Sequence, residues 1–328
     1  MTLEKLGDGI FVDTAKIDKI KNLDSVIFDC DGVLVDISNS YDLAIKKTVE
    51  FILKKMADID QPNFVNDKII DGFKATGGFN DEVDVTYSFI VSVVAAKKLG
   101  QKPSEFVFEV IKHSNQTGIL SVERYLDSLN VDISDIRKKL DYPGEHDTNP
   151  LYSIFDEIFY GPDLYYKLYG RKPEFFNEKG LIDNDIVLIT TDLIEKLKEK
   201  FGKKISIVSG RGLVSTKYSL KEFLDEFDIE NSRFLEDEPR EFAKPNPQPL
   251  VSCIKGLESS CCMFVGDSTE DILMAKKAEE LGSKTIFCAI YGTSKDPQSK
   301  RNLFEQKNAD IILESIDLIP KALNLVKN

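Results

Sequence analysis

Two carboxylates follow directly on an apolar run near the start of the chain. The run Val26-Ile27-Phe28 is typical of a buried strand, and Asp29 and Asp31 come straight after it. Residues two apart in an extended chain point to the same side, so both carboxylates can face one site. Paired negative charge at the end of a buried strand requires something positive close by.

Three further stretches carry polar groups suited to the same site, two of them directly after apolar runs. They offer a hydroxyl, a bare backbone amide, two cations and two more carboxylates. The residues are Ser209, Gly210, Arg211, Lys244, Asp267 and Asp271. Two prolines, Pro245 and Pro247, stiffen the loop that carries the lysine.

These residue types point to phosphate chemistry assisted by a metal. Aspartates crowded into one site repel one another, and Mg²⁺, which takes oxygen ligands, offsets that repulsion. The lysine and the hydroxyl suit a phosphate group. A carboxylate that attacks phosphorus gives an aspartyl-phosphate, and the metal and the lysine offset the repulsion between the two anions. The second carboxylate, Asp31, can protonate the leaving oxygen and later activate water.

The pattern of strands and helices predicts the fold that would position these groups. Short apolar runs alternate with helical patterns, which indicates an α/β fold with a doubly wound, Rossmann-like parallel sheet. Its runs are 25–30, 204–209, 262–266, 284–290 and 309–313. Ligands of such sheets bind beyond the carboxyl ends of the strands, where the polar groups stand.

A long helical insertion separates the first strand from the second. Residues 38–185 show helical patterns, such as 41–56 and 81–99, and no clear buried strand. We therefore predict a core domain of residues 1–37 and 186–328 with an inserted, mostly α-helical cap domain of residues 38–185. The polar residues at 38–40 and 178–180 are expected to be its flexible connections. Residues 1–23 receive no predicted role.

Four segments together resemble a known family. FDCDGVLVD, IVSGR, AKPNP and VGDSTED, in this order, resemble the four motifs of the haloacid dehalogenase superfamily. The insertion resembles the helical cap of subfamily I. The resemblance covers roughly residues 25–36 and 186–328, and it implies a phosphatase-like hydrolase.

The resemblance also implies a role for each polar residue. Asp29 would be the nucleophile and a metal ligand. Asp31 would be the general acid and base, with its backbone carbonyl on the metal. The other implied roles are phosphate binding by Ser209, Gly210 and Lys244, metal binding by Asp267, and ordering of the lysine or of a metal-bound water by Asp271.

Three residues have open interpretations. Arg211 could contact the substrate, cap the following helix or pair with a surface carboxylate. In the stretch 74–81, two glycines interrupt a helical pattern. This stretch is either a connection in which Asn80 or Asp81 caps the next helix, or a specificity loop in which Lys74 and Asn80 meet the substrate.

Composition excludes several classes of function. The net charge of −13 argues against general nucleic-acid binding. The sequence shows no apolar signal segment, no membrane-spanning stretch and no cysteine framework among its five cysteines. We therefore expect a cytoplasmic protein without nucleic-acid or membrane partners.

The function expected is a Mg²⁺-dependent phosphatase that hydrolyses a small phosphorylated metabolite through an aspartyl-phosphate. Two alternatives stay open: a phosphomutase of the β-phosphoglucomutase type, which also needs Asp31, and a non-catalytic binding module on the same fold.

Overall fold

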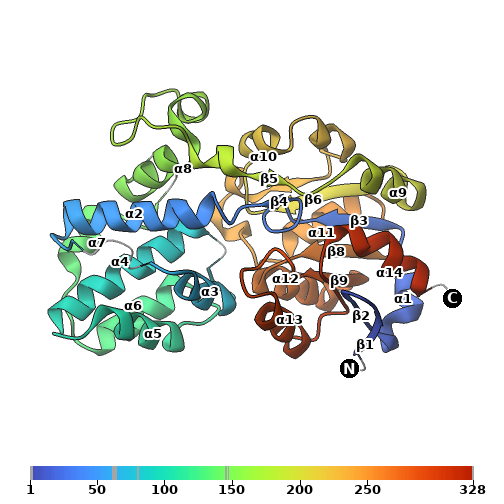
Figure 1. Cartoon of the computed structure of the whole chain (residues 1–328), viewed down its shortest axis with the longest axis horizontal. Helices are drawn as coiled ribbons and strands as arrows, with labels where there is room; N and C mark the ends of the chain where they lie inside the picture. The colour runs from blue at the N-terminus through green and yellow to red at the C-terminus, as the bar shows by residue number, and fades with distance from the viewer. Residues whose placement is uncertain (1–2, 61–64, 80, 145, 147, 327–328) are drawn as a thin grey trace. The chain divides into compact units, whose positions relative to one another are not determined.

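The computed structural model describes residues 3–60, 65–79, 81–144, 146 and 148–326. The chain folds as two compact units, both drawn in Figure 1. The first unit comprises Met1–Asp36 and Ile186–Asn328, and the second comprises Ile37–Asp185. No helix in the described ranges combines the length and the hydropathy needed to cross a bilayer.

The first unit is built on a mostly parallel sheet. Across the described residues this sheet has eight strands in the order β1-β2-β10-β9-β8-β3-β6-β7. Neighbouring strands from β10 to β7 run parallel, whereas β2 is antiparallel to both β1 and β10. The strands are β1 Leu3–Gly7, β2 Ile10–Asp13, β3 Ser25–Phe28, β6 Ile205–Ser209, β7 Arg233–Phe234, β8 Cys262–Gly266, β9 Thr285–Ile290 and β10 Ile311–Leu313.

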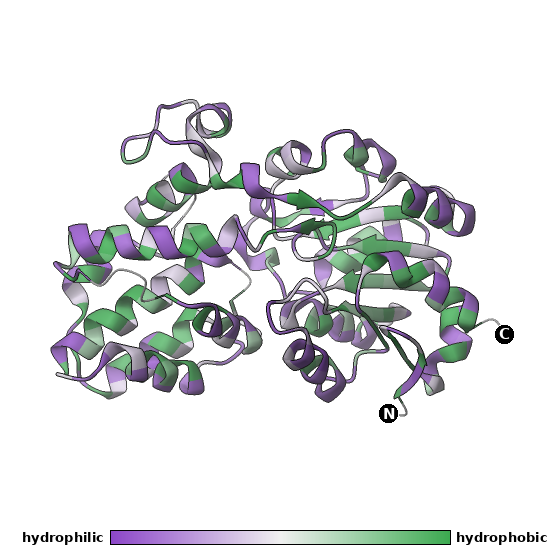
Figure 2. Cartoon of the chain, in the orientation of Figure 1, coloured by the Kyte–Doolittle hydropathy of each residue, from purple (hydrophilic) through white to green (hydrophobic). Residues whose placement is uncertain are grey.

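Helices bury both faces of this sheet, so the doubly wound α/β fold predicted from the sequence is confirmed. Ile27 packs in one apolar cluster with side chains of α11, α12 and α13. Val26 and Phe28 point to the opposite face and are also 0% exposed. Figure 2 shows the resulting hydrophobic strands between helices of mixed polarity. The helices are α1 Ile17–Lys21, α9 Thr191–Phe201, α10 Leu213–Leu220, α11 Gln248–Gly256, α12 Thr269–Glu280, α13 Pro297–Gln306 and α14 Ile319–Leu325, with the 3-10 turns η1 Thr14–Lys16, η3 Lys221–Glu226, η4 Leu235–Asp237, η5 Arg240–Phe242 and η6 Ile316–Leu318.

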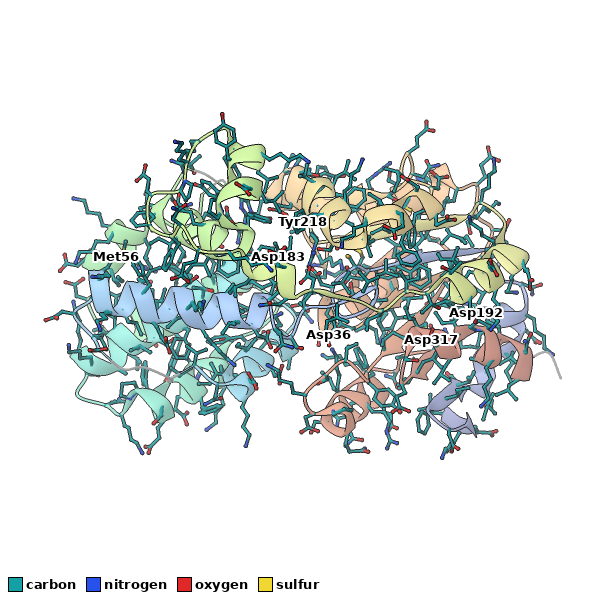
Figure 3. The ribbon with its side chains drawn as sticks, turned by 45° about the horizontal axis from the view of Figure 1, so that its top comes forward. Asp36, Met56, Asp183, Asp192, Tyr218 and Asp317 are labelled. Carbon is teal, nitrogen blue, oxygen red and sulfur yellow. The ribbon has the colours of Figure 1, made fainter. Side chains whose placement is uncertain are left out.

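The outer surfaces of these helices carry mostly polar side chains, with some apolar ones. Asp192 in α9 and Asp317 in η6, both labelled in Figure 3, are exposed. Leu213 and Tyr218 in α10 are exposed as well.

The second unit has a core of its own around helix α4. This helix, Glu82–Lys98, is buried at every position from Val83 to Ala96. A helix that is buried all round lies in the centre of a bundle, and α2, α5, α6 and α8 all pack on α4. The other elements are α2 Tyr41–Met56, α3 Asp67–Ala75, α5 Pro103–His113, α6 Ile119–Ser128, α7 Ser134–Leu140, α8 Pro150–Tyr169 and η2 Leu181–Asn184.

The chain passes between the units through a small antiparallel ladder rather than through loose connections. Strand β4, Val35–Asp36, pairs with β5, Ile186–Val187. The segments expected to be flexible connections lie inside the second unit. Ser40 is 0% exposed there. A Cβ atom on Gly180 would lie 2.3 Å from the carbonyl oxygen of Tyr160.

The first residues of the chain, which had no predicted role, extend the sheet. Strand β2 pairs with β10 through Ile10–Leu313 and Val12–Ile311, and β1 forms the edge beyond it. Ile10 and Val12 are both 0% exposed. The N-terminal hairpin therefore covers an edge of the sheet that would otherwise be open.

We expect Ile10→Ala to lower the free energy of unfolding by about 2–5 kcal/mol, because it removes buried atoms from the first position of β2. Urea denaturation measures this loss. Glu4→Ala, at an exposed position of β1, is the matched control and should stay within about 0.5 kcal/mol of the unchanged protein. A loss for Ile10→Ala no larger than that of the control would show that β2 contributes nothing to the core.

Candidate functional site

The order of the strands brings the three polar strand ends to one edge of the sheet. β3 lies between β6 and β8 and runs parallel to both. Asp29 follows β3, and its backbone N–H donates to the carbonyl of Val265 at 2.8 Å, which continues the ladder beyond the strand. Ser209 ends β6, and Asp267 follows β8. Residues far apart in the sequence thus become neighbours where ligands of such sheets bind.

Lys244 lies between two of the carboxylates. Its ammonium is 2.7 Å from Asp29 Oδ1 and 2.7 Å from Asp271 Oδ1, and its side chain is 0% exposed. Burial alone would lower the pKa of Lys244, but Asp271 and Asp29 raise it above the ordinary value, so the lysine stays charged.

One lysine does not compensate two buried carboxylates completely. Burial raises the pKa of Asp29 well above its ordinary value; Lys244 opposes this rise, and Asp271 and Asp31 add to it. The negative charge of Asp29 is therefore costly in this fold. Its Oδ1 also accepts a hydrogen bond at 2.7 Å from the backbone N–H of Cys30.

The donor set fits a hard divalent cation. Asp29, Asp267 and Asp271 each offer a carboxylate oxygen, and these oxygens lie within 4.8 Å of one another. All of the donors are oxygen, which suits Mg²⁺ rather than a metal that prefers nitrogen or sulfur. The turn at Gly32, with φ of +72°, leaves room for this cluster, because a Cβ atom there would lie 2.2 Å from Asp267 Oδ2.

Asp271 orders the loop that carries Asp267. Its Oδ2 accepts hydrogen bonds from the backbone N–H groups of Asp267 at 3.2 Å and Ser268 at 3.1 Å, and from the Ser268 hydroxyl at 2.7 Å. Ser268 in turn caps α12 by accepting from the Asp271 N–H. Oδ2 holds the loop, and Oδ1 is directed at Lys244. The role of Asp271 in ordering the lysine or a metal-bound water stays a prediction.

Arg211 pairs with the second carboxylate of the DxD pair. Its Nη2 lies 2.6 Å from Asp31 Oδ1, and its side chain is 0% exposed. Its Nη1 donates to the Ser219 hydroxyl at 2.6 Å. Of the alternatives considered for Arg211, the structure shows a carboxylate pair, but with Asp31 in the interior rather than with a surface residue.

Ser209 and Gly210 form the turn after β6. The Ser209 side chain is buried, and its oxygen accepts from the Arg211 N–H at 3.2 Å. Glu236 and Asp237, which the sequence analysis did not single out, accept from the backbone N–H groups of Gly212 at 2.7 Å and Leu213 at 2.8 Å. These bonds fix the start of α10 directly after the turn.

A second lysine, absent from the sequence motifs, reaches the acidic cluster from α13. The Lys300 ammonium donates to Asp267 Oδ2 at 2.5 Å. The hydroxyl of Thr293, earlier in the same segment, donates to the carbonyl of Gly32 at 2.9 Å. No local signal in the sequence marks Lys300, since it lies on a polar surface helix 33 residues beyond its partner.

In the second unit, Lys74 pairs with Glu82 Oε1 at 3.0 Å. Burial raises the pKa of Glu82, and Lys74 opposes the rise. Asn80 lies outside the described residues. Asp81 caps α4, since its carboxylate accepts from the Val83 N–H at 2.8 Å, and it also accepts from the Tyr152 hydroxyl at 2.6 Å.

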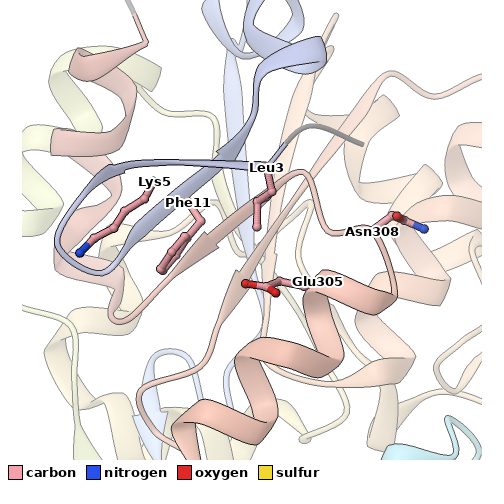
Figure 4. A pocket seen from close by; sticks show the side chains of 5 residues that line it. All are labelled: Leu3, Lys5, Phe11, Glu305 and Asn308. Atoms are coloured by element: carbon pink, nitrogen blue, oxygen red, sulfur yellow. The ribbon is translucent and has the colours of Figure 1, made fainter.

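A pocket elsewhere in the first unit contains none of these residues. Its volume is about 570 Å³, and it lies against the N-terminal hairpin and the end of α13 (Figure 4). It is lined by Leu3, Lys5, Phe11, Glu305 and Asn308. Its one lysine and one glutamate do not form a cluster comparable to the one at the strand ends.

Comparison with known proteins shows what this chain resembles. The sequence profile of the haloacid dehalogenase-like hydrolase family matches residues 23–279. The solved structure of phosphatase Tt82 from Thermococcus thioreducens is similar with a TM-score of 0.54 and 20% identity, over 85% of this chain and 98% of that chain. A phosphonoacetaldehyde hydrolase like protein from Oleispira antarctica is similar with a TM-score of 0.50 and 15% identity, over 93% of each chain. No curated protein matches the sequence. The two structural likenesses show the fold, and the profile covers well over half of the chain.

We expect Lys244→Met to lower the free energy of unfolding by about 3–5 kcal/mol near neutral pH, because two buried carboxylates would lose their shared cation. The loss should shrink as the pH falls toward about 5. Burial already raises the pKa of Asp29, and a carboxyl that is protonated in the fold carries no charge to compensate.

Urea denaturation at several pH values, with a chelator present, measures this dependence. Lys255→Met removes the same charge from an exposed position of α11 and serves as the control. Equal losses in the two variants, or a loss that grows on acidification, would contradict the importance of the lysine between the carboxylates.

Proposed function

The chain belongs to the haloacid dehalogenase-like hydrolase family, and from this premise we propose that it is a Mg²⁺-dependent phosphatase acting on a small phosphorylated metabolite. One observation carries the proposal: Asp29, at the end of a central strand, lies beside a buried lysine and an oxygen-only cluster of carboxylates. A nucleophilic carboxylate with a fixed cation at 2.7 Å suits attack on an anionic phosphorus centre.

The proposed reaction has two steps. An oxygen of Asp29 forms a bond to phosphorus while the bond from phosphorus to the ester oxygen breaks, and Asp31 gives its proton to the leaving alcohol. Asp31 then takes a proton from water, whose oxygen attacks phosphorus and releases inorganic phosphate from Asp29. Arg211, at 2.6 Å from Asp31, would position this carboxyl group for both proton transfers.

The phosphate would be held by groups that the fold fixes in advance. Lys244 supplies the positive charge, and Ser209 and Gly210 supply a hydroxyl and a backbone amide at the end of β6. Groups placed before the reaction need no rearrangement as charge develops, which is the main source of electrostatic catalysis.

Asp29, Asp267 and the backbone carbonyl of Asp31 would hold Mg²⁺. When bound, the metal offsets the negative charges of the nucleophile and the phosphate. Asp271, whose Oδ1 is directed at Lys244, would support the lysine.

We expect Asp29→Asn to abolish the release of inorganic phosphate, because an amide does not attack phosphorus, and to leave the fold intact. The measurement is a phosphate-release screen over metabolite phosphates, with Mg²⁺ and after chelation, alongside circular dichroism. Asp225→Asn, at an exposed position, is the control and should retain activity.

Three results would count against the proposal. Near-normal phosphate release by Asp29→Asn would show that Asp29 is not the nucleophile. Full activity after chelation would show that the reaction does not need a metal. Isomerisation of a sugar phosphate without net phosphate release would identify a phosphomutase instead.

We further propose that the second unit selects the substrate. The strand ends of the first unit supply groups for a phosphate and a metal, and among the residues that the structure describes there we find no group suited to the rest of an ester. The helical unit, Ile37–Asp185, is inserted directly after the acidic turn, and closure over an ester would also exclude bulk water during the attack.

We expect Lys74→Ala to change the relative kcat/KM values of different metabolite phosphates by roughly tenfold, on the scale of one lost specific contact. Hydrolysis of a small aryl phosphate should be spared. Because Lys74 also forms an ion pair with Glu82, Lys102→Ala, which breaks the exposed pair with Glu105, is the control. Equal losses of kcat/KM on every substrate, or no loss at all, would show that the glycine-containing stretch 74–81 only connects two helices.

A further inference from the structure

Every carboxylate of the acidic cluster has a protein cation beside it. The closest pairs have N–O distances of 2.5–2.7 Å. The pairs are Asp29–Lys244, Asp271–Lys244, Asp31–Arg211 and Asp267–Lys300. The fold therefore supplies three positive charges for four negative ones among these residues, and the carboxylates can lie together even without a metal.

The three cations differ in how firmly the structure holds them. The side chains of Lys244 and Arg211 are 0% exposed, and each contacts two partners. The side chain of Lys300 is 19% exposed and makes its ion pair with Asp267 from outside the motif loops. Its four-carbon stem is flexible, and its ammonium regains hydration when it turns outward.

The segment that carries Lys300 is held close to the acidic turn. Thr293 donates to the carbonyl of Gly32 at 2.9 Å, and α13 begins shortly afterwards at Pro297. Lys300 lies in the second turn of this helix. Its backbone is therefore fixed near Asp267, while its ammonium can leave the carboxylate without a change of fold.

We propose that Lys300 is an intramolecular competitor of the divalent cation at Asp267. This inference rests on the proposed function, in which Asp267 is a metal ligand. An ammonium 2.5 Å from Asp267 Oδ2 occupies one side of the carboxylate that would hold the metal. A monovalent and a divalent cation placed a few ångströms apart repel each other strongly in a half-buried site. Binding of the metal displaces the Lys300 ammonium toward solvent.

Two consequences follow for the protein. Without metal, Lys300 balances the charge of Asp267 and stabilises the fold. With metal, the ion pair is lost, so the affinity for Mg²⁺ is lower than the carboxylates alone would give. Lys300 thereby sets the concentration of Mg²⁺ at which the site fills.

The test compares the affinities of Lys300→Met and the unchanged full-length chain for the metal alone. Titration calorimetry with Mg²⁺, and electron paramagnetic resonance of free Mn²⁺, report binding without any substrate. We expect Lys300→Met to bind both ions about tenfold more tightly, at the lower end of the effects seen for groups beside metal ligands. Lys295→Met removes one charge from an exposed position of the same segment and should change the affinity little. Lys300→Arg, which keeps the charge, should bind like the unchanged protein.

Thermal unfolding gives a second readout. In chelator, Lys300→Met should melt at a lower temperature than the unchanged protein, because Asp267 has lost its cation. Saturating Mg²⁺ should raise the melting temperature of Lys300→Met by more, since tighter binding to the folded state stabilises it further. Lys300→Gln, which keeps a polar end group, repeats both measurements if the methionine variant folds poorly.

An unchanged affinity in Lys300→Met would overturn the inference, and so would a weaker one, which would make Lys300 a support of Asp267. Either result, with Mg²⁺-dependent phosphate release intact in the unchanged chain, leaves the proposed function standing. A different result would contradict both proposals. If phosphate release does not depend on Mg²⁺, and no variant binds either ion, then the proposed function does not need a metal and the inference about Lys300 is wrong.

Discussion

Negative charge crowded at the carboxyl edge of a parallel sheet is the constraint on which the rest of this structure depends. Asp29 and Asp271 are buried there, and Asp31 and Asp267 lie beside them. Uncompensated carboxylates in such a place would cost several kcal/mol each, on the order of the whole stability of a domain. Compensation comes from separate segments: a proline-stiffened loop supplies Lys244, the end of β6 supplies Arg211, and α13 supplies Lys300.

The same ion pairs connect the stability of the fold with its proposed chemistry. Lys244 stabilises two carboxylates in the protein as it stands, and in the proposed reaction it would also meet the phosphate. Burying charged groups in a fixed arrangement lowers the free energy of unfolding, but these groups need little reorganisation when a substrate binds. Arg211, whose side chain is fully buried, compensates the charge of Asp31 in the same way. Stability and function therefore depend on the same few contacts.

The helical unit satisfies a different requirement. Its core is centred on α4, which is buried on all sides from Val83 to Ala96. The chain enters and leaves it through the paired strands β4 and β5, directly after the acidic turn. A unit with an independent core can change its surface without disturbing the charged edge of the sheet. This separation is what the proposed division between phosphate chemistry and substrate selection requires.

Local patterns in the sequence predicted the doubly wound fold and helices such as α2 at Tyr41–Met56. They also predicted that the motif aspartates lie together at one edge of the sheet. Short apolar runs that end in polar residues specify buried strands, and parallel strands place their ends together. Other features needed the tertiary structure. The pairing of the hairpin β1–β2 with β10 was not predicted, because it joins opposite ends of the chain. The partners of Arg211, in the turn after β6, and of Lys300, on α13, could not be predicted because a charged side chain shows no local preference for one carboxylate over another. Local patterns thus specify which residues reach the edge of the sheet. Which cation faces each carboxylate follows only from the folded chain, because that pairing depends on distances of a few ångströms between segments far apart in the sequence.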